Sequence, residues 1–276
     1  MPLIPLEDTF ADLINKAQKG RKITDERLAS VSVVSMEDLL AVKGGKPMVA
    51  VIRRVARHLR LNPDALEALA TRAWYPKRPI LARGFGVFNT PFKEYSVNSY
   101  LIWDTRSKLA AAFDTGADST EMVDFIKSEG LRLQLIFLTH THEDHVAGLT
   151  TLQQATQAEV WCHEAEAFSF PGLRTFKDGA YFHLAEVAVK ALLIGGHSPG
   201  MTCFYVSGLG LPLAITGDSL FAGSMGGCEA NHYEQQRRTI YNRVFTLPKD
   251  SVIAPGHGPL TSLAQEREHN PFFVNT

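Results

Sequence analysis

The segment LQLIFLTHTHEDH, residues 133–145, places three histidines and two acidic residues directly after an apolar run. The apolar run is typical of a buried strand, and His140 and His142, two residues apart, project on the same side of an extended chain. Asp144 and His145 follow once the chain turns, so they can face the same pocket from a second direction. Neutral imidazole and carboxylate are ligands that suit zinc, iron or manganese. The segment therefore predicts a metal site at the end of a buried strand.

Three further polar residues follow apolar runs, each in a turn rich in glycine or proline. They are His197 in GGHSPG, Asp218 in TGDSLFAG and His257 in PGHGP. Catalytic groups are commonly displayed on such turns, where a rigid scaffold positions a loop. One isolated histidine or aspartate would carry little weight, but three strand ends in series with the first cluster are hard to explain by packing. We therefore predict that these three residues belong to the same metal site.

The N-terminal part of the sequence differs in character from the remainder. Apolar residues recur at helical spacing over residues 10–17 and 48–59, and Asn62-Pro63 is typical of a helix start with proline in the first turn. A stretch with two prolines then suggests a boundary. We predict a helical N-terminal extension over residues 1–80 and a catalytic domain over residues 81–276.

The second part of the sequence alternates between strand and helix patterns. SVNSYLIWD and LAAAFDTG are typical of two strands joined by a turn near Arg106-Ser107, and further strands are predicted in VAVKALLIGG, MTCFYVSG, LPLAITG and SVIAP. Helices are predicted over residues 119–128 and 146–155, and AEVWCHEAEA is predicted to pass from strand to helix. This interleaving indicates a layered α/β fold.

Composition narrows the classes of function. Lys and Arg number 28 against 29 Asp and Glu, and the net charge of -1 gives no reason to expect a nucleic-acid partner. No apolar run approaches the roughly 18 residues that span a bilayer, and the first ten residues lack the pattern of a signal peptide. Three widely spaced cysteines form neither a disulfide framework nor a cysteine-only metal site. We therefore expect a cytoplasmic enzyme with a small-molecule substrate and no membrane partner.

As a set, the motifs THTHEDH, GGHSPG, TGDSLFAG and PGHGP resemble the metallo-β-lactamase-fold hydrolases, and among them the glyoxalase II-like group. The resemblance covers about residues 84–276. It implies an αββα sandwich of two mixed sheets with helices outside, and a binuclear metal centre at one edge. It also implies the division of the ligands: one metal is bound by His140, His142 and His197, the other by Asp144, His145 and His257, and Asp218 bridges the two.

The resemblance carries a mechanism with it. Two divalent ions roughly 3.5–4 Å apart, zinc first and iron or manganese as alternatives, make a bridging water acidic enough to give hydroxide near neutral pH. That hydroxide attacks a carbonyl carbon, and a metal stabilises the developing oxyanion. Asp144, which can orient the nucleophile, and Asp218 are the predicted catalytic residues. We predict a metal-dependent hydrolase of a small ester-like substrate, with a thioester favoured.

The sequence also departs from the glyoxalase II pattern. The full-length enzyme has a C-terminal helical domain that helps to hold glutathione, whereas only 19 residues follow His257 in this chain of 276. The loop after Asp218 lacks the expected Gly-Cys-Gly-Arg pattern. Glutathione recognition is therefore not implied. A β-lactamase is disfavoured because enzymes with that activity usually have cysteine where this chain has Asp218.

Other functions remain open. A lactonase would use the same metal centre, and a persulfide dioxygenase would use one iron held by two histidines and one aspartate. A non-enzymatic alternative is that the N-terminal helices bind nucleic acid or a protein partner. We expect these helices to pack on the sandwich or across a homodimer, since isolated helices of this length are marginal in water.

Several other residues are chemically attractive but have ordinary explanations. We predict that most of the remaining histidines are structural or exposed, that the arginines of residues 53–60 form a solvated face, and that three loop or helix residues near the pocket pack without a catalytic role. The histidines are His58, His163, His183 and His269, and the three others are Cys228, Tyr233 and Tyr241.

Overall fold

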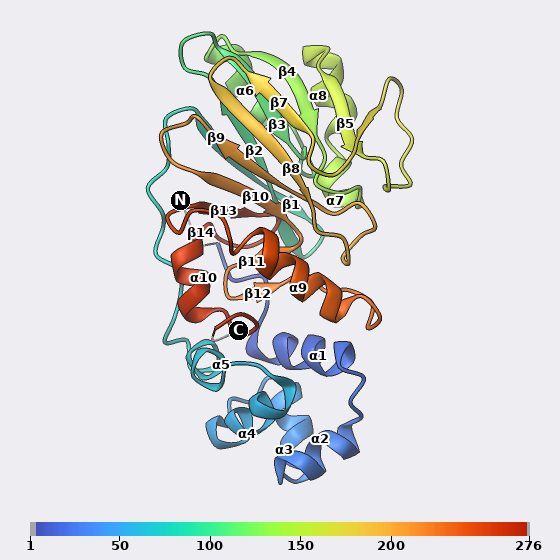
Figure 1. The fold of residues 1–276 in the computed structure, drawn as a ribbon, viewed down its shortest axis with the longest axis vertical. Coiled ribbons are helices and arrows are strands. Elements are labelled where there is room, and N and C mark those ends of the chain that lie inside the picture. Colours follow the sequence, from blue (N-terminus) through green and yellow to red (C-terminus); the bar gives the residue numbers. More distant parts are fainter. Residues whose placement is uncertain (1–3, 275–276) are drawn as a thin grey trace.

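The computed structural model describes residues 4–274, and Figure 1 shows a sheet sandwich with a group of helices at one end. Five N-terminal helices form that group, at the lower end of Figure 1. Their bounds are α1 (Phe10–Gly20), α2 (Asp25–Ser32), α3 (Met36–Lys43), α4 (Val49–Leu59) and α5 (Pro63–Ala70). Among the described residues, no helix is both long enough and apolar enough to cross a bilayer.

Local sequence explains where these helices begin. Thr9 and Asp12 form a reciprocal capping box at the start of α1. The Asn62 side chain accepts hydrogen bonds from two backbone N–H groups of α5, in which Pro63 occupies the first turn. The helix after Asn62 was expected to reach about Trp74, but α5 ends at Ala70 because the chain turns at Arg72, whose φ is 56°.

The first sheet has six strands in their order along the chain. They are β1 (Phe85–Phe92), β2 (Tyr95–Trp103), β3 (Leu109–Phe113), β4 (Arg132–Phe137), β5 (Glu159–His163) and β6 (Arg174–Phe176). The first three pair antiparallel, and β3 to β6 pair parallel. The sheet is therefore mixed, as expected, although β1 and β6 were missed by the sequence patterns.

The second sheet also has six strands and is mixed. Its spatial order is β14 (Thr261–Ser262), β13 (Val252–Pro255), β10 (Leu213–Gly217), β9 (Thr202–Ser207), β8 (Val187–Leu193) and β7 (Tyr181–Leu184). Only the pairing of β10 with β13 is parallel within it. A small hairpin of β11 (Leu220–Phe221) and β12 (Ser224–Met225) follows β10. The strands β7, β11, β12 and β14 are short and were not predicted.

Alternating side chains give each sheet two buried faces. Phe113 and Phe137 of the first sheet and Phe204 of the second meet between the sheets, with ring centroids 5.2–5.4 Å apart. The opposite face of the first sheet packs on α6 (Thr120–Ser128) and α8 (Leu149–Thr156). This arrangement is the αββα sandwich that the motifs implied.

The outer face of the second sheet shares one hydrophobic core with the N-terminal helices. Leu13 and Ile52 of that extension belong to the same buried cluster as Ala214 of β10 and Ile240 of α9 (Tyr233–Arg243). The helix α10 (Leu263–His269) adds Leu263 to this cluster. The expectation that the helices pack on the sandwich is confirmed, while a division into two domains near residue 80 stays a prediction.

Two helix predictions in the second part of the chain were wrong in detail. The single helix expected over residues 146–155 is two helices, α7 (Glu143–Val146) and α8, separated at Gly148. A Cβ at Gly148 would lie 2.8 Å from the Thr115 carbonyl oxygen, so close approach of two backbones needs glycine at this point. No helix follows β5, where a turn returns the chain to β6.

Candidate metal centre

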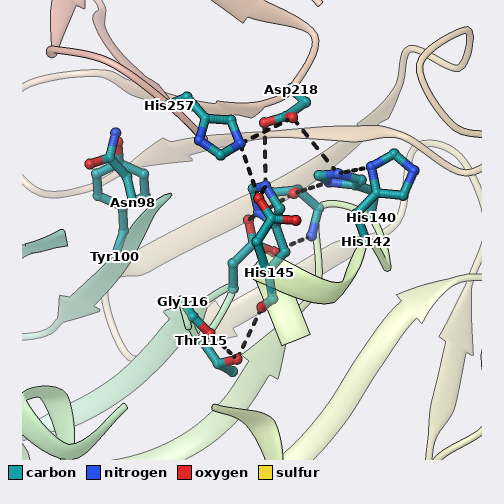
Figure 2. Close-up of polar contacts among 12 residues, drawn as sticks. Asn98, Tyr100, Thr115, Gly116, His140, His142, His145, Asp218 and His257 are labelled. Carbon is teal, nitrogen blue, oxygen red and sulfur yellow. Dashed lines mark hydrogen bonds and ion pairs between the residues drawn. The ribbon is translucent and has the colours of Figure 1, made fainter. Parts of the chain in front are cut away.

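All seven predicted ligands gather at one edge of the sandwich. His140 follows β4, His197 follows β8, Asp218 follows β10 and His257 follows β13. Strands β8, β10 and β13 run in the same direction, so their carboxyl ends meet at the same edge. Figure 2 shows side chains from these separate strand ends pointing toward one another. The strand-end pattern in the sequence therefore corresponds to spatial convergence.

One group of ligand atoms comes from three histidines. His142 Nδ1 lies 3.1 Å from His140 Nε2 and 3.0 Å from His197 Nε2. His140 is fully buried, whereas His142 is exposed at the mouth of the site. Three imidazoles thus present one nitrogen each to a common point that is open to solvent on one side.

A second group combines two histidines and an aspartate. Asp144 Oδ2 lies 3.2 Å from His257 Nε2 and 3.6 Å from His145 Nε2. Asp218 stands between the groups: its Oδ1 lies 3.4 Å from His145 Nε2, and its Oδ2 lies 3.4 Å from His257 Nε2 and 3.5 Å from His197 Nε2. One carboxylate therefore lies against both groups, and Figure 2 shows Asp218 above the rings of His140, His145 and His257.

The second ring nitrogen of three of these histidines is held by another group. His145 Nδ1 lies 2.9 Å from Asp114 Oδ2, His197 Nδ1 lies 2.9 Å from the Gly227 carbonyl, and His257 Nδ1 lies 2.8 Å from the Ser96 carbonyl. Such partners fix the tautomer and orientation of metal-binding histidines. Asp114 also accepts hydrogen bonds from the backbone N–H and hydroxyl of Thr139.

Glu166 joins two loops that carry ligands. Its carboxylate accepts hydrogen bonds from Thr141, beside His140, and from Ser198 and Gly200, beside His197. Thr141 lies 25 residues before this glutamate in the chain, and Ser198 and Gly200 lie 32 and 34 residues after it. One side chain therefore sets the spacing between the loops that present the three-histidine group.

Asn98 performs a similar task for the His257 turn. Its side-chain NH2 group donates to the Pro255 and Gly258 carbonyls at 3.0 and 2.9 Å, and the Tyr100 hydroxyl donates to the Pro255 carbonyl. Figure 2 places Asn98 and Tyr100 beside the ligand cluster. These contacts come from β2 and clamp the turn that positions His257.

Burial and charge oppose each other at the histidines. Burial lowers the pKa of His140 and His197. Burial acts in the same direction on His145, but the charges of Asp218 and Asp114 raise its pKa to about 10. For His257, the hydrogen bonds to Asp144 and Asp218 overcome burial and raise the pKa to about 11. The carboxylates of Asp114, Asp144 and Asp218 therefore favour positive charge at the positions of these rings.

The donor set fits divalent metal ions. Two nitrogens bound to one tetrahedral zinc at ~2.05 Å lie about 3.3 Å apart, close to the spacing within the three-histidine group. His145 Nε2 and Asp218 Oδ1 are buried without a hydrogen-bond partner, although they lie 3.4 Å apart. Buried polar atoms rarely stay unpaired, and a cation between them would satisfy both.

Sequence patterns missed several residues of the site. Asp114 follows β3 in FDTG, so the strand-end pattern that identified Asp218 could also have found it. Glu166 and Asn98 carry no such signal, because each acts on segments far away in the chain. Tyr95 stacks edge-on over His257, with ring centroids 5.3 Å apart, at the β1–β2 turn.

The N-terminal segment also reaches the site. The backbone of Glu7 lies against the turn at Gly258, directly after His257. Burial raises the pKa of the Glu7 carboxyl, while His257 lowers it. Nothing in the sequence around Glu7 indicated this proximity.

The residues that had ordinary explanations lie outside the ligand cluster. His58 and His183 are exposed, His163 is buried and accepts a hydrogen bond from the Ala165 backbone, and His269 packs on Trp74. The other three are Cys228, half-buried beside His197, Tyr233, buried on α9, and Tyr241, exposed on the same helix. The arginine face of α4 is solvated in part, with Arg53 paired to Asp64 and Glu67.

Known proteins are similar to this chain in sequence and in fold. Hydroxyacylglutathione hydrolase GloC from Haemophilus influenzae is 29% identical over 204 residues, which cover 66% of this chain and 95% of that protein. The crystal structure of BLEG-1 B3 metallo-beta-lactamase has a TM-score of 0.60 at 25% identity, covering 69% of this chain and all of that one. TTHA1623 in a di-iron-bound form has a TM-score of 0.55 at 26% identity, covering 67% of this chain and all of that one.

A family model described as the metallo-beta-lactamase superfamily matches residues 93–257. The matched segment contains all seven ligand-type residues and excludes the five N-terminal helices. It spans more than half of the chain, and the fold and the motifs agree with it. The protein therefore belongs to the metallo-beta-lactamase superfamily and is a metal-dependent hydrolase with glyoxalase II-like relatives.

Proposed function

We propose that the protein hydrolyses thioesters of small molecules at a centre of two divalent metal ions, most simply zinc. The convergence of two ligand groups on one edge, with Asp218 between them, carries this proposal. His140, His142 and His197 would hold one ion. Asp144, His145 and His257 would hold the other, and Asp218 would contact both. When bound, such a pair supplies an acidic water and an electrophile for the substrate carbonyl.

The chain's own residues then have distinct tasks. Asp144 of the second group would accept a hydrogen bond from the attacking water and orient it. Asp114 and the carbonyls of Ser96 and Gly227 keep the histidine rings in fixed orientations. The open side at His142 is the route by which a substrate reaches the centre.

The leaving group favours a thioester over a lactone. A departing thiolate has a conjugate-acid pKa near 8.5, so it leaves without much help from a proton donor. A lactone expels an alkoxide, which needs a well-placed general acid. Tyr233, one candidate for that role, is only 3% exposed and packs on α1. Relatives named hydroxyacylglutathione hydrolase support the same substrate class.

The test is a comparison of kcat/KM on metal-replete protein. Substrates are S-lactoylglutathione, a simpler thioester, a homoserine lactone and a cephalosporin, with metal content measured on the same samples. We expect about two metals per chain and thioesters as the best substrates. Lactone turnover tenfold above both thioesters, a difference of about 1.4 kcal/mol in transition-state binding, would overturn the thioester assignment.

Two controls separate the alternatives. Asp218→Ala should lose both metal and turnover, because it removes the carboxylate that faces both groups. Full metal occupancy in that variant would contradict the bridging role. Oxygen uptake with release of sulfite from a persulfide, together with one iron per chain, would instead identify a dioxygenase.

A further inference from the structure

A cavity of about 460 Å³ lies directly beside the three-histidine group. His197 and the loop Met225–Glu229 line one side of it, and Lys16 and Lys19 of α1 line the other. The helix α1 lies outside the segment that matches the superfamily. The cavity wall is therefore built jointly by the catalytic fold and by the N-terminal extension.

One short backbone segment fixes Lys16 relative to the metal ligand His197. Lys16 Nζ donates to the Met225 carbonyl at 3.0 Å, and His197 Nδ1 lies 2.9 Å from the Gly227 carbonyl. Gln236 Nε2 donates to the Gly226 carbonyl at 2.7 Å, between these two contacts. Lys16 is thus held at a defined place next to the reaction centre, although 209 residues separate it from Met225.

The Lys16 ammonium keeps a donor for a ligand. An ammonium has three N–H donors, and two of them serve Asp8 and the Met225 carbonyl. Asp8 does not line the cavity, and it also accepts a hydrogen bond from Ser224 at 2.6 Å. Among the described residues, no further hydrogen-bond acceptor contacts Lys16. Apart from the Phe221 ring, whose centroid lies 5.5 Å from the ammonium, its third donor has no partner in the described part of the chain and can serve a negatively charged group in the cavity.

Lys19 can also turn toward an anion. It pairs with Glu229 at 3.1 Å, but the two side chains are 59% and 78% exposed. Exposed ion pairs contribute little, so a ligand can replace Glu229 at low cost. Glu229 is the one acidic residue among the described residues that line the cavity, against two lysines.

The floor of the cavity leaves space for such a group. Gly227 has no side chain, and a Cβ at that position would meet only the Lys16 side chain, at 3.8 Å. The glycine does not adopt a positive φ, so its backbone does not require glycine. The absence of a side chain at this position keeps the path between His197 and Lys16 open.

We propose that this cavity holds the part of the substrate remote from the scissile carbonyl, and that Lys16 and Lys19 select a carboxylate there. The N-terminal extension is then a substrate-recognition element and the proposal rests on the thioester hydrolysis inferred above. The carboxylate replaces Glu229 at Lys19 and takes the free donor of Lys16.

The kinetic test uses two thioesters that differ in one charge. S-acetyl-3-mercaptopropionate carries the carboxylate, and S-acetyl-3-mercaptopropionamide replaces it with an amide of nearly the same shape. Thiol release is followed with metal-replete full-length protein. We expect a kcat/KM preference of at least roughly tenfold for the carboxylate, as charge-assisted hydrogen bonds are the strong ones.

Three variants locate the origin of that preference. Lys16→Gln should reduce the carboxylate-to-amide ratio by roughly tenfold, and Lys19→Gln by roughly threefold, because Lys19 is more exposed. Lys22→Gln makes the same change of charge just beyond α1, outside the cavity lining, and should leave the ratio unchanged. Lys19 has an exposed side chain, so its variant remains informative if loss of Lys16 beside Asp8 impairs folding.

A binding measurement separates recognition from chemistry. 5-Oxohexanoate and 5-oxohexanamide replace the sulfur atom with CH2 and cannot be cleaved as thioesters. Tighter calorimetric binding of the carboxylate, weakened by the Lys16 and Lys19 variants, supports recognition even if no thioester is hydrolysed. A ratio near one in the wild type overturns the proposal, as does a preference that survives both substitutions, since the carboxylate then binds elsewhere.

Discussion

Glu266 gives the protein a stability that depends on pH. Its side chain is fully buried on α10, and its Oε2 accepts hydrogen bonds from the Gly223 backbone at 3.0 Å and from Asn270 at 2.8 Å. Its Oε1 accepts a hydrogen bond from the Thr261 hydroxyl at 2.8 Å. Burial raises the pKa of this carboxyl from 4.5 to about 7, against the hydrogen bonds that lower it. The residue also links the loop after Asp218 to the strand after His257.

The sign and size of the effect follow from linkage. The unfolded chain releases the Glu266 proton near pH 4.5, whereas the folded protein keeps it until about pH 7. The folded state therefore binds more protons between these values, and the free energy of unfolding falls as the pH rises through that window. A shift of this size corresponds to about 3 kcal/mol, fully lost above pH 7.

Glu266→Gln removes this dependence. The amide can keep its carbonyl toward Gly223 and Asn270, and its NH2 group can donate to Thr261, whose hydroxyl rotates to accept. We expect similar stability for the two proteins at pH 5 and a variant more stable by up to about 3 kcal/mol at pH 8.

The assay is urea unfolding of wild type and variant from pH 5 to pH 8, with the difference between them taken at each pH. This difference cancels the titration of the other groups, including the ligand histidines. Glu268→Gln, on the exposed side of the same helix, is the matched control and should give a difference near zero at every pH. A Glu266→Gln difference that does not change with pH would falsify the reasoning.

Three further predictions address the centre and its support. His142→Ala should reduce metal content from about two ions per chain to about one without lowering the metal-free melting temperature, because His142 is an exposed member of its group; metal analysis and calorimetry test this. Asp114→Asn should weaken metal affinity by roughly 10–100-fold, measured by chelator competition, because the single amide oxygen cannot accept from both the Thr139 N–H and His145 Nδ1, as the two carboxylate oxygens do. Gly20→Ala should destabilise the protein by about 1–3 kcal/mol in urea unfolding, since its Cβ would lie 2.2 Å from the Tyr233 ring; an unchanged midpoint would refute close packing of α1 on α9.

The N-terminal helices share a hydrophobic core with the second sheet. Their apolar stripes pack against α9, α10 and the outer face of the second sheet, so they complete a layer of the sandwich. The same extension brings Lys16 of α1 to the cavity and Glu7, which precedes α1, to the His257 turn. The extension therefore both packs on the sandwich and lines the cavity in which we propose that substrate is recognised.

Strands with apolar runs and glycine-rich ends were predicted well from the sequence. Those strands, β4, β8, β10 and β13, lie inside their sheets rather than at an edge. Every residue of β10 and β13 is buried, and β4 and β8 bury about half of theirs, so all four read as largely apolar segments. The edge strand β1 was missed because FGVFNTPF mixes glycine, asparagine and proline with its apolar residues. The helix α9 was missed because YEQQRRTIYNR has almost no apolar stripe.

The sequence by itself selected the residues of the candidate centre. Histidine and aspartate at the ends of apolar runs carry local signals, because both the strand and the turn that displays the ligand are encoded by neighbouring residues. The motifs THTHEDH, GGHSPG, TGDSLFAG and PGHGP were therefore sufficient to select all seven residues that the fold brings together.

Only the tertiary structure decided what surrounds that chemistry. Asp114 orients His145 across 31 residues, Glu166 joins loops on either side of it in the chain, and Lys16 reaches Met225 across 209 residues. None of these pairings has a local signal, because hydrogen bonds and ion pairs between distant segments depend on how sheets and helices pack. Short motifs identify the candidate ligands. The orientation of those side chains and the shape of the adjoining cavity depend on how the whole chain packs.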